Sequence, residues 1–308
     1  MSRRNGWVWL AVLSVAWSVA QSAPQAVART RDPYPKAAAA YATMVDGELL
    51  WGRNLDARRS PASLTKLLTA LVVLDTPGWS PDALLDVSAT AAHVQRTRVG
   101  LHAGDRVRAE DALTAMLVHS ANDACMVLAE SYGPSVERFV ARMNARAAAL
   151  GLNDSHFAQP CGLDAPGQYS TARDLLTLAQ AAHADERIAR ITATETATIV
   201  TQNQHELSFH NTNQLLGSMG SVIGLKTGFT STAGRCLIAV AQQDGHKVWV
   251  VLLNARQRWG TARRIIDAAF ASAQRTQLAN RASGPGGGTT VFATAGAGLM
   301  NSDAGKTR

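Results

Sequence analysis

Two pairs of short hydrophobic runs along the chain have the spacing of β-hairpins. In residues 41–54 the apolar runs flank the Asp-Gly pair at 46–47, and in residues 236–254 they flank the Asp-Gly pair at 244–245. An Asp-Gly step between such runs favours a tight turn, because both residues tolerate a positive φ. The run over residues 224–229 has the composition of the beginning of a further strand.

The residues between the two hairpins favour helices. Pro61 precedes an apolar segment, Gly151 ends another, and Thr171 with Asp174 forms a capping box. Helices are predicted over residues 63–74, 110–132, 136–150, 171–183 and 258–275. A helical middle between strand-rich ends predicts an α+β fold, in which the N- and C-terminal strands share one antiparallel sheet that is flanked by helices.

The two ends of the chain differ from this folded part, which we place at residues 29–276. Trp7–Ala20 is an apolar run of 14 residues after two arginines and before small residues, the pattern of a secretory signal peptide over residues 1–28. A membrane-spanning helix needs ~20 apolar residues. We therefore expect an exported protein, periplasmic or cell-wall-associated, with no transmembrane helix in its mature form. Residues 277–308 are glycine-rich and are predicted to be a flexible tail.

Composition and charge narrow the class of partner. Of the 308 residues, 46% are hydrophobic and 17% are charged, as in a globular enzyme. The net charge of +7 falls to +5 without residues 1–28, which hold two arginines and no acidic residue. Such a charge suits an anionic cell-wall polymer, whereas no clustered basic and aromatic stretch indicates nucleic-acid binding. Cys125, Cys161 and Cys236 are too few for a disulfide scaffold or a zinc site; one disulfide is permitted, and the sequence does not choose its pair.

Ser63 and Lys66 form the first of three short motifs that carry chemistry. A Ser-x-x-Lys spacing at the start of a helix puts the hydroxyl and the amine on one face. A serine hydroxyl becomes a nucleophile when a neighbouring base takes its proton, and lysine can do so when burial holds it neutral. The motif alone is weak, because a solvated serine beside a surface lysine has the same pattern.

Ser120-Ala121-Asn122 is the second motif. On a single helix positions i and i+2 face apart, so Ser120 and Asn122 act together only on a turn between two helices. There Ser120 would relay a proton and Asn122 would hold a substrate amide. An ordinary polar turn gives the same three residues, so this motif is also weak on its own.

Lys226-Thr227-Gly228 is the third motif and lies in the predicted strand that ends at Phe229. Gly228 leaves the strand surface bare, so that an extended peptide can lie against it. Lys226 and Thr227 would hold a substrate carboxylate, although in an ideal strand their side chains point to opposite faces. The N–H groups of Ser63 and Phe229 are candidate oxyanion donors.

The ordered trio resembles the low-molecular-mass penicillin-binding proteins, the serine D-alanyl-D-alanine carboxypeptidase and endopeptidase family. The likeness rests on residues 61–66, 120–124, 169–175 and 226–230, and it covers roughly residues 38 to 270. Residues 209–213 before the third motif, with no second domain after it, resemble the single-domain endopeptidase branch.

This resemblance implies a β-lactamase/DD-peptidase-like fold with an all-helical insert. It implies hydrolysis of D-alanyl-D-alanine-type bonds in peptidoglycan stem peptides through an acyl-Ser63 intermediate, with Lys66 and Ser120 as further catalytic residues. It also implies substrate binding by residues 122 and 226–229, and β-lactam antibiotics as covalent inhibitors. No cofactor and no metal are expected. Trimming of a terminal D-alanine and cutting of a cross-link both stay open, as does the question of which lysine is neutral.

Other functions fit parts of the sequence. A class A β-lactamase shares the first and third motifs but needs a Glu-x-x-Leu-Asn segment, which is missing. His119 lies beside Ser120, yet there is no Gly-x-Ser-x-Gly elbow for a Ser-His-Asp hydrolase and no His-Glu-x-x-His for metal catalysis. A catalytically inactive cell-wall-binding protein remains an alternative.

Overall fold

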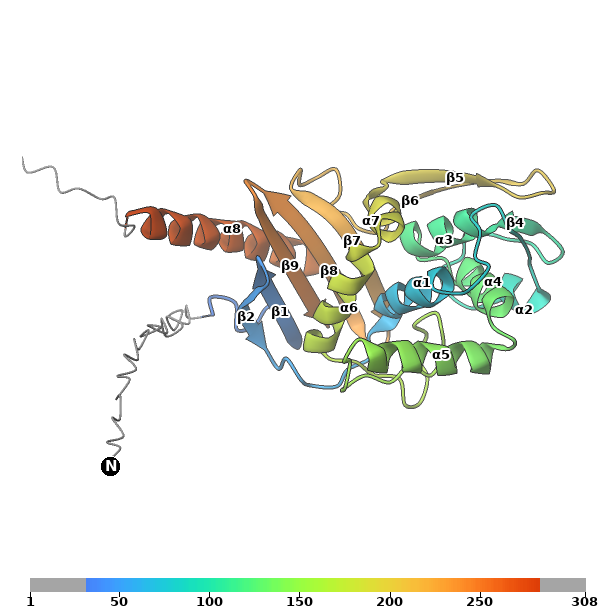
Figure 1. Cartoon of the computed structure of the whole chain (residues 1–308), viewed down its shortest axis with the longest axis horizontal. Coiled ribbons are helices and arrows are strands. Elements are labelled where there is room, and N and C mark those ends of the chain that lie inside the picture. The colour runs from blue at the N-terminus through green and yellow to red at the C-terminus, as the bar shows by residue number, and fades with distance from the viewer. Residues whose placement is uncertain (1–31, 283–308) are drawn as a thin grey trace, which may run out of the picture. The chain divides into compact units, whose positions relative to one another are not determined.

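A five-stranded antiparallel sheet forms the centre of the computed structural model, which describes residues 32–282. The strand order is β2-β1-β9-β8-β7 (Figure 1). Their bounds are β1 Ala40–Val45, β2 Glu48–Arg53, β7 Val222–Thr230, β8 Gly234–Gln243 and β9 His246–Leu253. Both predicted hairpins are confirmed, and β1 pairs with β9, so strands from the two ends of the folded part share one sheet. The predicted signal peptide lies outside the described residues.

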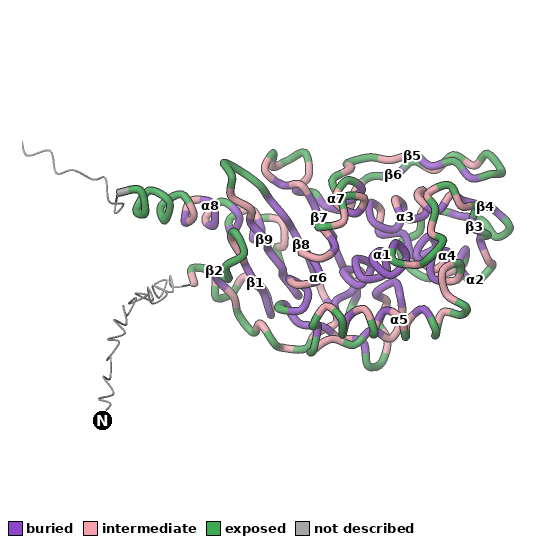
Figure 2. Tube along the Cα trace, in the orientation of Figure 1, coloured by how far each residue is buried: buried purple, intermediate pink, exposed green. Residues whose placement is uncertain are grey.

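Helices cover both faces of this sheet. In β8, Leu237 and Ala239 pack with Ile265 of α8 (Arg258–Ala282), whereas Ile238 and Val240 belong to the core on the other face. Because side chains alternate between the faces of a strand, a strand with helices on both sides is apolar throughout. Figure 2 shows the central strands buried along most of their length. The α+β class is confirmed.

A helical region lies beside the sheet and is built around α1 (Lys66–Leu74), whose residues are all buried. An apolar helix with no polar face fits this central place. The single 3₁₀ turn η1 (Ala62–Thr65) leads into it. The surrounding helices are α2 Ala89–Ala92, α3 Ala109–Val118, α4 Asn122–Tyr132, α5 Val136–Ala149, α6 Ala172–Ala184 and α7 Glu186–Ala193.

Two small antiparallel sheets of two strands each complete the fold. The first consists of β3 Leu84–Asp86 and β4 Arg106–Arg108, and the second of β5 Thr196–Val200 and β6 Glu206–His210. The β5–β6 hairpin extends alongside α3, and its turn reaches β4, where the Gln202 N–H donates to Arg106 O (Figure 1). Within residues 32–282, no helix is both long enough and apolar enough to cross a membrane.

Two predicted helix boundaries are wrong. The helix predicted over residues 110–132 is broken into α3 and α4, because Ser120 has a φ of +64°, which lies outside the helical range. The helix predicted to end at Arg275 continues to Ala282, six residues into the predicted tail. Residues 276–282 contain no glycine or proline, so the helix propagates although its side chains over 274–281 are exposed. The rest of the predicted tail, residues 283–308, lies outside the described part.

Candidate active site

Ser63 and Lys66 meet at the junction of η1 and α1. Lys66 is completely buried, and its Nζ lies 3.0 Å from Ser63 Oγ. The same Nζ lies 2.7 Å from Asn122 Oδ1 and also contacts the carbonyl oxygen of Cys161. The first two motifs therefore meet at a single buried amine.

The break between α3 and α4 places the second motif on a turn between helices. Ser120 and Asn122 can act together only on such a turn. Asn122 is the first residue of α4, and its Nδ2 donates to Gln95 O while its Oδ1 faces Lys66. The next residue, Asp123, is fully buried and accepts from the backbone N–H groups of residues 99, 100 and 101. Asp123 thus fixes the loop that borders Asn122. Ser120 is buried, with 7% of its surface exposed.

The third motif lies on β7, an edge strand of the five-stranded sheet. Lys226 is buried, and its Nζ contacts Thr227 O at 3.3 Å; among the described residues no carboxylate is paired with it. Thr227 Oγ1 shares a 2.6 Å hydrogen bond with Thr212 Oγ1. Phe229 is 56% exposed. An edge strand has free backbone groups for an extended peptide, as the strand-addition hypothesis requires.

Gly228 also has a packing role that the sequence did not indicate. A Cβ atom at this position would lie 3.0 Å from Ala62 Cβ and 3.2 Å from Ser63 N. The missing side chain therefore lets β7 approach the segment that carries the nucleophile. The structure accordingly ties Gly228 to the spacing between the first and third motifs.

Burial lowers the pKa of both lysines. Desolvation lowers the pKa of Lys66 well below its usual range; the charge of Lys226 lowers it further, and Asp123 raises it. Desolvation, and then the charge of Arg258, lowers the pKa of Lys226 to about 7. A neutral amine beside a serine hydroxyl is the arrangement that a lysine general base needs.

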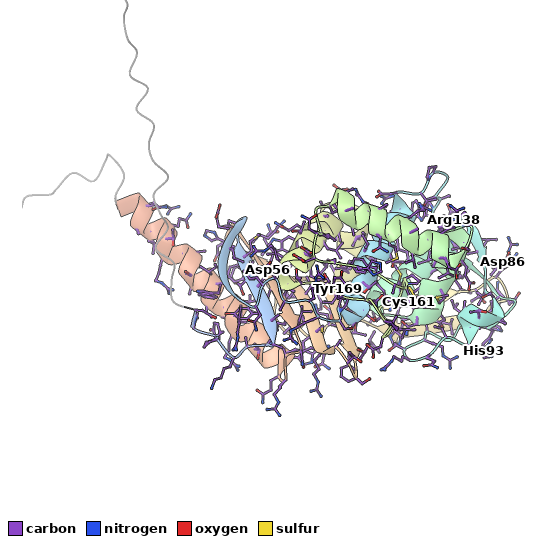
Figure 3. All side chains as sticks on the ribbon, turned by 90° about the horizontal axis from the view of Figure 1, so that it is seen from below. Asp56, Asp86, His93, Arg138, Cys161 and Tyr169 are labelled. Atoms are coloured by element: carbon purple, nitrogen blue, oxygen red, sulfur yellow. A yellow bond between two sulfur atoms is a disulfide. The ribbon has the colours of Figure 1, made fainter. Side chains whose placement is uncertain are left out.

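Two neighbours of the site were not found from the sequence. Arg258 begins α8, and its Nη1 donates to Gly228 O at 2.9 Å and to Cys236 O at 3.1 Å. Cys161 is joined to Cys125 by a disulfide, and Cys236 is a buried free thiol. Figure 3 shows Cys161 in the interior among the helices. Neither neighbour belongs to a motif, because its role depends on contacts between distant parts of the chain.

A family model described as D-alanyl-D-alanine carboxypeptidase, Peptidase S11, matches residues 27–257. This range contains all three motifs and all five strands of the central sheet. The chain belongs to the D-alanyl-D-alanine carboxypeptidase family. The resemblance inferred from the motifs is thereby confirmed.

Relatives named as carboxypeptidases and relatives named as endopeptidases both align with the chain. The D-alanyl-D-alanine carboxypeptidase DacB2 of Mycobacterium tuberculosis is 34% identical over 238 residues, which cover 75% of this chain and 80% of that protein. The D-alanyl-D-alanine endopeptidase of Pseudomonas aeruginosa is 34% identical over 250 residues, which cover 79% of each. DacF of Bacillus subtilis is 29% identical, and the alignment covers 76% of this chain but only 62% of DacF. The chain therefore spans less than two thirds of some relatives.

Solved structures in the carboxypeptidase family confirm the predicted fold. The crystal structure of the Streptomyces K15 DD-transpeptidase superimposes with a TM-score of 0.72 at 30% sequence identity. The match covers 76% of this chain and 97% of that one. The DD-peptidase-like arrangement of sheet and helices is therefore shared over most of the folded part.

Proposed function

We propose that this family member is a serine-type DD-peptidase that hydrolyses D-alanyl-D-alanine-type bonds of peptidoglycan stem peptides through an acyl-Ser63 intermediate. The observation that carries the proposal is the completely buried Lys66 amine 3.0 Å from Ser63 Oγ. The family membership supports the same substrate class. One carboxypeptidase and one endopeptidase relative each match at 34% identity, so the proposal includes both bond positions.

The contacts of Lys66 orient it for proton transfer from Ser63. A neutral amine has two N–H groups and one lone pair. The oxygens Asn122 Oδ1 and Cys161 O accept the two N–H groups, which leaves the lone pair for the hydroxyl of Ser63. Lys66 then takes the hydroxyl proton as Oγ attacks the substrate carbonyl carbon, and the N–H groups of Ser63 and Phe229 stabilise the oxyanion. Ser120 relays the proton held by Lys66 to the leaving amine as the C–N bond breaks. Water then attacks the acyl ester and gives a proton to the neutral Lys66, and that proton returns to Ser63 Oγ as the ester bond breaks.

The substrate carboxylate is placed at Lys226. This buried amine has no carboxylate partner among the described residues, and Arg258 adds a second positive charge behind β7. A bound carboxylate would neutralise both and accept a hydrogen bond from Thr227. Asn122 and the free edge of β7 at Gly228 would hold the peptide part of the substrate.

Export is part of the proposal. Residues 1–28 have the pattern of a signal peptide. The disulfide between Cys125 and Cys161 supports an oxidising compartment, because such bonds are rare in the reducing cytosol. We therefore place the mature protein in the periplasm or at the cell wall, where its substrate lies.

Purified muropeptides test the reaction. Linear pentapeptide and cross-linked dimer substrates are incubated with the mature protein, and the products are separated by mass. Release of D-alanine from the linear substrate establishes carboxypeptidase action, and splitting of the dimer establishes endopeptidase action. If protein shown to be folded leaves both substrates as intact as Ser63→Ala does, the proposed activity is wrong, and an inactive cell-wall-binding protein becomes the better account.

Acylation by benzylpenicillin should decline above neutral pH. Lys226 has a pKa of about 7 and carries its charge below that value, so the attraction for the penicillin carboxylate is lost as pH rises through 7. Hydrogen bonds to charged groups contribute about 1.5–3 kcal/mol, which predicts a fall of roughly 10- to 100-fold in the second-order acylation rate constant. Burial also lowers the pKa of Lys66 well below its usual range, which favours the neutral amine that the base requires.

Stopped-flow acylation between pH 5.5 and 9 measures this decline. Arg258→Gln removes the charge that lowers the pKa of Lys226, so the decline should move to higher pH. Arg263→Gln is the matched control, because Arg263 is a half-buried arginine of α8 that donates to Ser218 O. A rate constant that stays flat through pH 9 in the unaltered protein would contradict the assigned role of Lys226.

A further inference from the structure

Three potential metal ligands lie together outside the site described above. His102 and Asp105 come from the segment between α2 and β4, and His205 comes from the turn between β5 and β6. One ligand atom from each lies within 4.8 Å of the other two. His205 stands 100 positions after Asp105, which is why no short motif in the sequence indicates this cluster.

The carboxylate of Asp105 is held by contacts with three residues. Asp105 is 1% exposed, and its Oδ1 accepts from Asn203 Nδ2 at 2.9 Å. Its Oδ2 accepts from the backbone N–H of His102 at 3.1 Å and lies 3.1 Å from His205 Nδ1. The two imidazole rings pack edge to face, with an interplanar angle of 70° and centroids 4.7 Å apart. Neighbouring groups that orient a ligand in this way are typical of metal sites.

Among the described residues, no lysine or arginine forms an ion pair with Asp105. The guanidinium of Arg106 pairs with Asp86 at 3.2 Å and contacts Gln202. The His205 side chain is 42% exposed, so an ion can reach the cluster from solvent.

We propose that His102, Asp105 and His205 form a binding site for a divalent transition-metal ion, for which Zn²⁺ is the best fit. Two imidazoles and one carboxylate are ligands that Zn²⁺ accepts, with water in the fourth position. Ligand distances of about 2.0–2.2 Å require the exposed rings to turn toward Asp105. The ion would join the β5–β6 hairpin to the loop that Asp123 holds beside Asn122.

Zinc titration of the chelator-treated mature protein tests this site. Isothermal titration should show one Zn²⁺ bound with a dissociation constant in the micromolar range or tighter, and thermal denaturation should show a higher Tm with zinc. His205→Ala and Asp105→Asn should each weaken binding at least tenfold, since loss of one ligand leaves two. His93→Ala is the matched control, because His93 is an exposed histidine that contacts Ala89 O at the outer end of the helical region (Figure 3).

Two results would overturn the zinc site. One is no binding by the unaltered protein, and the other is equal affinity in His205→Ala and the unaltered protein. Ser63→Ala should bind zinc like the unaltered protein. The metal site therefore stands or fails independently of the peptidase proposal.

A second inference rests on the disulfide and on the function proposed above. Both oxygens that accept the N–H groups of Lys66 belong to segments that the disulfide joins. Asn122 lies one helical turn before Cys125 in α4, and Cys161 supplies its own carbonyl oxygen. Cys125 and Cys161 are completely buried, and their Cα atoms lie 5.9 Å apart. The bond therefore links the two acceptors covalently across 36 positions of sequence.

We infer that Cys125 and Cys161 are positioning residues, which hold both acceptors at the distance that directs the lone pair of Lys66 to Ser63. A disulfide that only stabilises the fold would leave the chemistry of the folded enzyme unchanged. A disulfide that positions Lys66 affects the acylation step itself, because misplacement of a catalytic group slows the reaction without weakening substrate binding.

The double variant Cys125→Ala, Cys161→Ala distinguishes these roles. At a temperature well below its Tm, we expect its acylation rate constant with benzylpenicillin to fall at least tenfold, with little change in the dissociation constant of the initial complex. Cys236→Ala, which removes the buried free thiol, should keep the rate constant of the unaltered protein. An unchanged rate constant in the folded double variant would overturn the inference. Failure of the unaltered protein to be acylated would instead reject the proposed function.

Discussion

Replacing Lys66 by methionine is expected to slow acylation of Ser63 by roughly 10²- to 10⁴-fold, the range that a general base contributes. Methionine has a similar length and suits the buried place of Lys66 in α1, so the fold should be retained. The methionine sulfur cannot take the hydroxyl proton, and Asn122 Oδ1 loses its N–H donor. The rate is measured by stopped-flow with a fluorescent penicillin, and folding by circular dichroism.

The control for this variant is another lysine far from the nucleophile. Lys247 pairs with Gln242 at the end of β8 away from Cys236, so Lys247→Met should be acylated at the rate of the unaltered protein. Acylation of Lys66→Met at that same rate would contradict the assignment of Lys66 as the base. It would leave Lys226 as the next candidate.

Gly162→Ala is expected to have the second large effect. Gly162 has a φ of +80°, and a Cβ atom there would lie 2.0 Å from Ala62 O and 2.7 Å from Ser63 N. Both atoms are backbone, so the segment that carries the nucleophile must move. Ala62 itself has a positive φ of 49°, which leaves this segment few alternative conformations. We expect acylation to fall by at least about 10²-fold, the loss that a 1 Å misplacement can cause, and the free energy of unfolding to fall by about 2–4 kcal/mol.

The same loop contains a matched glycine. Gly167 has a φ of +77°, but the nearest atom to its Cβ position is His156 Nδ1 at 3.8 Å. For Gly167→Ala, the free energy of unfolding should therefore fall by only about 1–2 kcal/mol, the cost of a positive φ for alanine. Its acylation rate should be near normal. Urea denaturation and acylation rates of the two variants separate backbone strain from close approach. Equal behaviour of the two variants would contradict the packing of Gly162 against Ala62.

Local patterns in the sequence predicted the parts of the fold that depend on neighbouring residues. The Asp-Gly turns produced both main hairpins, and Thr171 begins α6 by accepting from the Asp174 N–H, as a capping residue does. The Ser-x-x-Lys spacing placed the Ser63 hydroxyl and the Lys66 amine together, because three positions on a helix share a face. The family resemblance was the reason to expect the three motifs to lie close together.

What the sequence did not predict depends on contacts between distant residues. The break at Ser120 has a positive φ, a conformation that favours glycine or asparagine, so a serine there gives no signal of it. The Cys125–Cys161 pair, the position of Arg258 behind β7 and the cluster at Asp105 each join segments far apart in the chain. The packing role of Gly228 was also not predicted, since only the fold shows that η1 passes beside it.

The most direct test of the account is the intact mass of the mature protein after incubation with benzylpenicillin, beside a Ser63→Ala control. The account predicts one added penicillin mass per protein, located on the peptide that contains Ser63, and no addition to Ser63→Ala. No adduct on folded protein, or an adduct that persists in Ser63→Ala, would contradict the claim that the buried Lys66 amine activates Ser63 as the nucleophile.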